Sequence, residues 1–317
     1  MSIEERRAPA IAPLSALLLA AVASLGVSPD APRARAVVLG IAQDGGVPHL
    51  GCRQELCESA RRDPSRRQRV ASLGLVDDAS GQRFLVDATP DLASQIESLN
   101  AVAPAREANP RRPVDGILLT HAHIGHYGGL MYLGREALGA DGVPVYATPR
   151  LARFLRENGP WSQLVSLGQI VLHEIEPGRP VRLSPGLEAT ALRVPHRDEF
   201  SDTVAWRVRG PSRTLLYLPD IDKWEKWDRP LEDEVKAVDL AFLDGTFADA
   251  GEVPGRSLAE IPHPLVGETA ARLGPRGLGG RVWFIHLNHT NRLLWDAAAR
   301  EALAPLHVAR DGEEHPL

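Results

Sequence analysis

Short apolar segments rich in branched residues alternate with helical patterns along the chain after residue 35. Gly, Pro or Asp bounds each apolar segment, which is typical of β-strands. No low-complexity linker separates the segments, so the sequence predicts one large α/β domain with layered sheets. We expect helices at 90–100, 128–138, 264–273 and 291–303, and strands at 36–42, 72–77, 83–88, 116–120, 143–148, 187–194, 203–208, 214–219, 238–244 and 281–286.

The composition narrows the classes of function. The chain has 317 residues, 44% of them apolar, and a formal charge of -5. It can therefore bury a large core, but it lacks the general positive field that holds a nucleic-acid backbone. The basic run 61–69 is interpreted as a solvated loop, and the glycines of 273–280 as a loop without phosphate-binding context. We expect a small-molecule substrate and no nucleic acid.

The N-terminal segment differs from the rest of the chain. Residues 8–27 are apolar and uncharged, and residues 34–36 (ARA) resemble a small-x-small cleavage site. We interpret 1–35 as a signal peptide or N-terminal anchor that precedes a domain at 36–317, although Glu4 and Glu5 are unusual in a signal. The expected location is periplasmic or secreted, or cytoplasmic if the segment is not a signal. Membrane attachment is expected only through this segment.

Two cysteines, Cys52 and Cys57, lie five residues apart. They are compatible with a local disulfide or with free thiols. They are also compatible with a structural zinc for which His49 would be a third ligand. The sequence does not decide between these arrangements.

Three histidines follow directly on the apolar segment 116–119 (GILL). His121, His123 and His126 lie within six residues, in the sequence THAHIGH. Because strand 116–120 would end at Thr120, the imidazoles would project from a strand end, where sites are common. Neutral imidazole nitrogens bind zinc or iron at about 2.1 Å. The spacing therefore favours a metal site over a hydrogen-bonded surface cluster.

Further candidate ligands follow other predicted strands. His196 follows strand 187–194, Asp220 follows strand 214–219, and His286 with His289 ends the strand at 281–286. Each residue alone would be interpreted as structural, for example as a helix cap or a turn residue. Together they predict that distant parts of the chain converge on one metal-binding cleft.

The ordered segments FLVDATPD, THAHIGH, VPH, LYLPD and FIHLNHTN resemble the metallo-β-lactamase superfamily. The resemblance covers most of the chain after residue 35 and implies a four-layer αββα sandwich with a metal site along one sheet edge. Within the superfamily, LGIAQDGGVPHLGC and HLNHTN are most similar to the branch of pyrroloquinoline quinone biosynthesis protein B.

The resemblance also implies roles for individual residues. Asp87 would order the loop that bears the histidines, and Asp220 would bridge two metals and accept a hydrogen bond from the attacking water. The implied first site is His121, His123 and His196. The implied second site is His126 and His286, with His289 as the alternative to His286.

One residue departs from the family pattern. Gly125 stands where the usual H-x-H-x-D-H motif has an aspartate that binds the second metal. Glycine has no ligand atom, so the second site would depend on the remaining residues. Asp44, Asp222 and His289 are candidates to substitute, and a single metal is the alternative.

The resemblance implies a metal-dependent hydrolase with one or two zinc ions, in which a metal-activated water attacks an ester, lactone, amide or phosphodiester. The alternatives are an oxygenase with one Fe²⁺, suggested by the quinone-biosynthesis branch, and a metal-dependent binding protein without turnover. Trp161, Trp224 and Trp227 would either line a substrate pocket or pack against the fold. The sequence does not indicate the oligomeric state.

Overall fold

The computed structural model describes residues 34–317 apart from 106–108, 253–256 and 258–259. Almost all of the predicted signal or anchor segment at 1–35 therefore lies outside the described residues. Strand β1 starts at Ala34, so residues 34–36 are part of a buried strand. No helix among the described residues has the length and apolar character needed to cross a bilayer.

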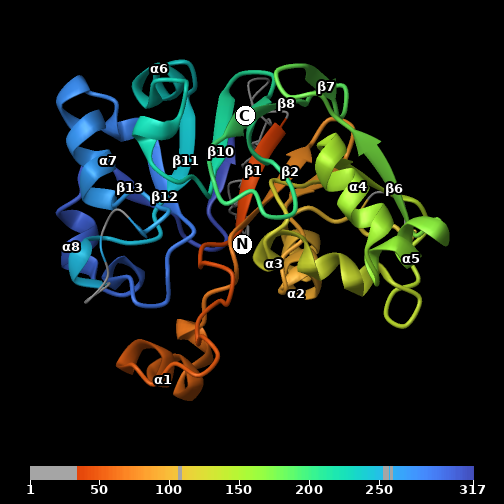
Figure 1. Ribbon diagram of the computed structural model, residues 1–317, viewed down its shortest axis with the longest axis horizontal. Coiled ribbons are helices and arrows are strands. Elements are labelled where there is room, and N and C mark those ends of the chain that lie inside the picture. The colour runs from red at the N-terminus through yellow and green to blue at the C-terminus, as the bar shows by residue number, and fades with distance from the viewer. Residues whose placement is uncertain (1–33, 106–108, 253–256, 258–259) are drawn as a thin grey trace, which may run out of the picture. The chain divides into compact units, whose positions relative to one another are not determined.

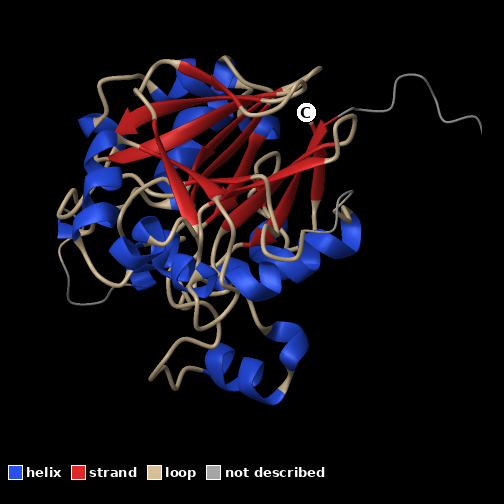
Figure 2. Ribbon diagram, turned by 90° about the vertical axis from the view of Figure 1, so that its right-hand side faces the viewer, coloured by secondary structure: helices blue, strands red, loops and turns tan. Residues whose placement is uncertain are grey.

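Two seven-stranded sheets form the centre of the domain, with helices on the outer side of each (Figures 1 and 2). The strand order is β14-β1-β2-β3-β4-β5-β6 in one sheet and β13-β12-β11-β10-β9-β8-β7 in the other. The strands are β1 Ala34–Gly40, β2 Ser72–Asp77, β3 Gln82–Val86, β4 Gly116–Leu118, β5 Val143–Ala147, β6 Ile170–Glu174, β7 Pro180–Arg182, β8 Glu188–Val194, β9 Thr203–Arg209, β10 Thr214–Leu218, β11 Leu240–Asp244, β12 Val282–Ile285, β13 His307–Val308 and β14 Glu314–Pro316.

The helices are mostly short. Figure 1 shows α2 to α5 beside the sheet of β1 to β6, and α6 to α8 beside the sheet of β10 to β13. Their bounds are α1 Glu55–Arg62, α2 Leu92–Val102, α3 Ile124–Tyr127, α4 Pro149–Glu157, α5 Trp161–Ser166, α6 Leu231–Lys236, α7 Val266–Leu273 and α8 Ala297–Glu301. Short 3-10 helices are η1 Pro64–Arg66, η2 Gly128–Leu133, η3 Trp224–Lys226, η4 Ala250–Glu252, η6 Gly274–Arg276, η7 Gly279–Arg281 and η8 Arg292–Leu294.

Two predicted helices differ in the structure. The segment 128–138 is a 3-10 helix, η2, followed by turns, and the segment 291–303 is divided into η8 and α8. At Gly129 an added Cβ would lie 1.9 Å from the carbonyl oxygen of Thr89, so the chain passes very close to its neighbour there. In the second segment, the Asp296 side chain caps the N-terminus of α8 and so separates it from η8. Both boundaries depend on local contacts that an apolar pattern does not encode.

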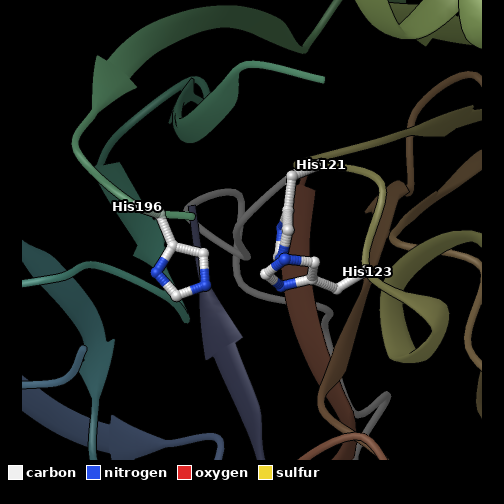
Figure 3. Close-up of side chains that lie close together, drawn as sticks. All are labelled: His121, His123 and His196. Carbon is white, nitrogen blue, oxygen red and sulfur yellow. The ribbon is translucent and has the colours of Figure 1, made fainter. Parts of the chain in front are cut away.

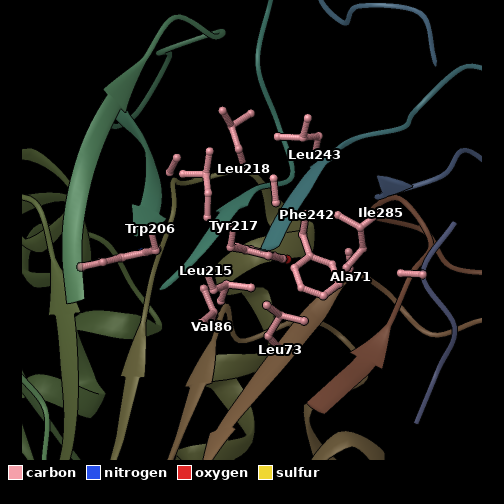
Figure 4. Packing of buried hydrophobic residues seen from close by; sticks show 14 of the residues in the cluster. Ala71, Leu73, Val86, Trp206, Leu215, Tyr217, Leu218, Phe242, Leu243 and Ile285 are labelled. Carbon is pink, nitrogen blue, oxygen red and sulfur yellow. The ribbon is translucent and has the colours of Figure 1, made fainter. Parts of the chain in front are cut away.

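The larger core lies between the two sheets. Along β3, Phe84 and Val86 face this core, whereas Leu85 faces a second core beneath α2, α4 and α5. This alternation follows from the two-residue period of a strand. Figure 4 shows side chains of both sheets, such as Leu73 and Phe242, packed together in the larger core. The sandwich thus holds the two sheets in fixed positions relative to each other.

Trp206 connects the sheets near the histidine segment. It is 1% exposed in β9, and its indole nitrogen donates a hydrogen bond of 3.1 Å to the carbonyl of Leu119. We expect Trp206→Ala to lower the free energy of unfolding by about 3–5 kcal/mol, because it removes a large buried ring. Urea unfolding would measure this loss. Trp295→Phe, at a half-exposed ring, is the control and should stay within about 0.5 kcal/mol of wild type; an equal effect of the two variants would contradict the prediction.

The strand directions bring particular residues to one edge of the sandwich. Strands β3 and β4 are parallel, and so are β10, β11 and β12. The residues that follow these strands therefore emerge at the carboxyl-terminal edge of each sheet, where α/β proteins place their sites. Strands β1 and β8 run in the same direction as β3 and β10, because two antiparallel pairings separate each pair. The residues delivered to these edges are Asp44, Asp87, His121, His196, Asp220, Asp244 and His286.

Candidate metal centre

His121, His123 and His196 form the first group of converging donors. Each offers a ring nitrogen, and these nitrogens all lie within 4.8 Å of one another. His121 and His123 come from the segment after β4, and His196 from the segment after β8 of the other sheet. Figure 3 shows the ring of His196 facing the other two from the opposite side. The structure therefore brings together the three residues of the first implied site.

Asp44, His126, Asp220 and His286 form the second group. His126 Nε2 lies 2.9 Å from Asp220 Oδ2 and 3.3 Å from Asp44 Oδ1. His286 Nε2 lies 3.2 Å from Asp220 Oδ2 and 3.4 Å from Asp44 Oδ1. Neighbouring donors in a tetrahedral zinc site are about 3.4 Å apart when each bond is about 2.1 Å long. The four donor atoms therefore have nearly the spacing that a zinc ion requires.

Asp220 lies between the two groups. Its Oδ2 atom faces His126 and His286, whereas its Oδ1 atom is 3.7 Å from His196 Nε2. His121 Nε2 is also 3.7 Å from Oδ2. The Asp220 carboxylate thus lies close to imidazoles of both groups, as the bridging role expected from the sequence requires.

The buried nitrogens of these groups lack other partners. Among the described residues, Nε2 of His121 and both ring nitrogens of His196 have no hydrogen-bond partner. A buried polar atom without a partner costs free energy, so such atoms are rare unless something else satisfies them. A metal ion that accepts these lone pairs would remove that cost. The donor set of imidazoles and carboxylates fits zinc and also fits ferrous iron.

Asp87 and Thr120 hold the first pair of imidazoles by their other nitrogens. Asp87 Oδ2 lies 2.7 Å from His126 Nδ1, and the Thr120 hydroxyl lies 3.0 Å from His121 Nδ1. Asp87 also accepts hydrogen bonds from the backbone nitrogen and the hydroxyl of Thr120. This network directs the Nε2 lone pairs of His121 and His126 toward the cleft. Asp87 thus occupies the supporting position that the resemblance implied.

A second Asp–Thr pair on the other sheet repeats this arrangement. Asp244 Oδ2 lies 2.8 Å from His263 Nδ1, and the Thr246 hydroxyl lies 3.1 Å from His286 Nδ1 and donates to Asp244. Sequence analysis missed Asp244, Thr246 and His263. Asp244 is the last residue of β11, and Asp220 follows β10 closely. The same pattern of an apolar strand followed by Asp could therefore have identified Asp244 in the sequence. His263 lies between two prolines outside any regular element, where no periodic pattern identifies it.

Burial and neighbouring charges set the ionisation of the site. Burial lowers the pKa of His196 to about 4 and holds the pKa of His121 well below its usual value, although Asp220 acts in the opposite direction on both. Burial raises the pKa of Asp220, but the charge of His286 and other imidazoles holds that pKa well below its usual value. His121 and His196 are therefore neutral at pH 7, and Asp220 is ionised. At His126, burial is outweighed by nearby carboxylates, Asp87 first, which raise the pKa well above its usual value, so a metal in the second group would have to displace a proton there.

Glu199 supports His123 from the surface. The carboxylate Oε2 lies 3.0 Å from His123 Nε2, and the side chain of Glu199 is 48% exposed. Because this contact occupies Nε2, the nitrogen of His123 that remains for a metal is Nδ1. A carboxylate on the outer nitrogen is a common support for a metal-binding histidine.

Backbone strain is concentrated at the site. Asp87 and His286 have φ values of 69° and 63°, and no other non-glycine residue in the described part of the chain has a positive φ. Such conformations persist only when surrounding contacts enforce them, and they cluster at functional sites. Both residues belong to the networks described above.

Two candidates from the sequence lie outside the groups. The ring of His289 stacks on His49 with centroids 4.2 Å apart, and His289 is in none of the converging groups. Of the two residues that the sequence left open, His286 is the one that lies in the second donor group. The Asp222 carboxylate pairs with Lys226 at 2.6 Å and does not reach the second group either.

Cys52 and Cys57 are free thiols, and no disulfide joins them. The zinc knuckle is not formed, since Nδ1 of His49 lies 2.9 Å from the carbonyl of Leu50 and these three residues do not converge. Cys57 is buried, and its Sγ accepts a hydrogen bond from the backbone nitrogen of His49. Burial and the neighbouring Cys52 raise the pKa of the Cys57 thiol to about 11.

This pKa predicts unequal reactivity of the two cysteines. At pH 8 only about one Cys57 thiol in a thousand would be ionised, so iodoacetamide should label Cys52 much faster than Cys57. Peptide mass spectrometry of the native protein would show the difference. Unfolding in urea should make the two rates similar, and equal labelling of the native protein would contradict the prediction.

The three tryptophans pack against the fold. Trp224 and Trp227 are buried and donate hydrogen bonds to Thr269 and to the carbonyl of Arg193. Trp161 packs on Tyr127, which follows His126, with ring centroids 4.7 Å apart. Of the two interpretations, packing is the one that the structure supports.

Comparison with known proteins identifies relatives over most of the chain. A family model described as a beta-lactamase superfamily domain matches residues 82–287. Coenzyme PQQ synthesis protein B of Methylorubrum extorquens strain PA1 is 28% identical over 310 residues, covering 87% of this chain and 97% of that protein. The protein of the same name from Rhodopseudomonas palustris is 28% identical over 322 residues, covering 89% and 99%.

Solved structures give the same result for the fold. The zinc-bound PqqB structure from Methylobacterium extorquens matches with a TM-score of 0.74 and 24% identity, covering 89% of this chain and 100% of that one. A diphosphatase of the PhnP family matches with a TM-score of 0.63 and 21% identity, covering 89% and 96%. Human tRNase Z, short form, matches with a TM-score of 0.54 and 16% identity, covering 89% and 98%. These likenesses confirm the predicted αββα sandwich.

Proposed function

Because the chain belongs to the beta-lactamase superfamily, we propose that it is a metal-dependent hydrolase of an ester, lactone, amide or phosphodiester. The observation that carries the proposal is the pair of donor groups joined by Asp220, with buried imidazole nitrogens that lack other partners. Zinc is the metal we propose, because the spacing of the second group suits tetrahedral coordination.

Zinc bound at these groups would acidify a water molecule and polarise the bond to be cut. The residues of this chain would prepare that chemistry. Asp220 would accept a hydrogen bond from the water and fix its direction of attack. The Asp87–Thr120 and Asp244–Thr246 pairs would keep the imidazoles in the tautomer that exposes Nε2.

His263 is the residue that we propose for the proton transfer to the leaving group. Its Nδ1 atom is bound by Asp244 at 2.8 Å, which leaves Nε2 as the nitrogen available to a substrate. The centroid of its ring lies 5.5 Å from the ring centroid of His196 and 6.1 Å from that of His286. An imidazole oriented by a carboxylate is a common general acid.

A second candidate is a step in the synthesis of a quinone cofactor. The similarity to coenzyme PQQ synthesis protein B over most of the chain favours it. In this case the same donors would hold one ferrous iron and support an oxidation by O₂.

One experiment separates these candidates. The purified protein would be stripped with a chelator, reconstituted with Zn²⁺ or Fe²⁺, and tested on chromogenic lactones, lactams, esters and phosphodiesters with O₂ uptake recorded. The proposal expects zinc-dependent hydrolysis of one substrate class without O₂ uptake. Iron-dependent O₂ uptake would support the second candidate, and metal binding without any turnover would contradict both.

A further inference from the structure

The second donor group contains a carboxylate from an unexpected part of the chain. We propose that Asp44, on the loop after β1, is the second-metal ligand that replaces the aspartate missing at position 125. This inference rests on the metal site of the proposed function and specifies how its second half is completed.

The Asp44 carboxylate packs directly against Gly125. A Cβ placed on Gly125 would lie 2.2 Å from Oδ1 and 2.6 Å from Cγ of Asp44. The Asp44 carboxylate thus fills the volume into which a side chain at position 125 would extend. Gly125 lies within α3 at the segment that carries His123 and His126. Glycine at 125 and a carboxylate at 44 are therefore complementary, since a larger residue at 125 would displace Asp44.

The direction of the carboxylate supports the same role. Asp44 Oδ1 lies 3.3 Å from His126 Nε2 and 3.4 Å from His286 Nε2. His126 is fully buried, and its Nε2 atom lies 2.9 Å from Oδ2 of Asp220. Asp44 and Asp220 therefore approach the same Nε2 atoms of the two imidazoles. A shared ion would bind between these four side chains.

The loop that carries Asp44 is fixed to the segment that carries His286. The backbone nitrogen of Gln43 donates to the carbonyl of Leu287, and the nitrogen of Leu287 donates to the carbonyl of Ile41, at 2.9 and 2.8 Å. Leu287 directly follows His286, so backbone hydrogen bonds set the distance between Asp44 and that imidazole. A ligand held in this way is positioned before the metal binds, which favours affinity.

The test measures metal binding, which is independent of turnover. Wild type, Asp44→Asn and Asp222→Asn would be titrated with Zn²⁺ against a chromophoric chelator, with thermal unfolding as a check on folding. Asp44→Asn keeps the shape of the side chain but removes its charge. We expect it to weaken the second zinc by about a hundredfold or more and to leave the first unchanged. Asp222→Asn is the control and should bind two zinc ions as wild type does.

A second pair of variants tests the complementarity without changing a ligand. Gly125→Ala should also weaken the second zinc, because the methyl group would push the Asp44 carboxylate away. Gly128→Ala is its control, since a Cβ there meets only the side chain of Ile124.

Two tightly bound zinc ions in folded Asp44→Asn would overturn the inference, and so would equal weakening of both sites. Two zinc ions in wild type without hydrolysis of any substrate would count against the proposed function and leave this inference intact.

Discussion

Replacing His196 with alanine is expected to reduce hydrolysis by about a thousandfold or more. His196 supplies the only donor of the first group that comes from the sheet opposite His121 and His123. Without it, two imidazoles remain, and the ion that acidifies the water would be held weakly. Stabilisation by a metal amounts to several kcal/mol in the transition state, and each 1.36 kcal/mol corresponds to a factor of ten in rate.

The measurement is kcat/KM on the best substrate of the panel, together with the metal content of the same preparation. His173→Ala is the matched control, because His173 is exposed in β6 and stacks on Tyr146 away from the site. The control should retain both metal and activity. Full activity of His196→Ala at wild-type metal content would show that the first group does not hold the catalytic metal.

Replacing His263 with alanine is expected to separate catalysis from metal binding. His263 Nδ1 is bound to Asp244, and His263 converges with Asp244 and His286 but belongs to neither the first nor the second donor group. A general acid contributes about 10²–10⁴ to the rate. We therefore expect a loss of this size in kcat for substrates with an alkoxide leaving group. Nitrophenolate departs without a proton, so nitrophenyl substrates should lose little.

The dependence on the leaving group distinguishes a proton donor from a structural residue. A merely structural role of His263 would lower the rate for both kinds of leaving group alike and would also reduce the metal content. Thr269→Val is a control for a purely structural change. Thr269 is buried in α7, and its hydroxyl accepts a hydrogen bond from Trp224. An equal loss for both leaving groups in His263→Ala would contradict the assigned role.

Strand ends explain why much of the site could be predicted from the sequence. An apolar segment followed by His or Asp marks a residue that emerges at a sheet edge, and parallel strands bring those edges together. This pattern predicts the positions of His121, His196, Asp220 and His286 at the sheet edges. The resemblance to a family added Asp87, whose bonds to Thr120 and His126 show how it supports the histidines.

The remaining site residues depend on contacts that no sequence pattern contains. His263 lies in a segment without periodicity, and its place is set by Asp244 and Thr246. Asp44, Asp222 and His289 are equivalent candidates for the second metal in the sequence. Only the backbone hydrogen bonds of residues 41–43 with Leu287 bring Asp44 to that site. The helix expected at 128–138 is replaced by η2, because Gly129 passes against the backbone of Thr89. In each case a long-range packing contact decides the outcome.

In the proposed metal centre, imidazoles from both sheets hold one ion. A crystal of the protein soaked in zinc, with data collected at the zinc absorption edge, tests it most directly. We expect an anomalous peak about 2.1 Å from ring nitrogens of His121, His123 and His196, and a second peak beside His126, His286 and the carboxylates of Asp44 and Asp220. A zinc peak confined to Cys52 and Cys57, with none at the histidines, would contradict it.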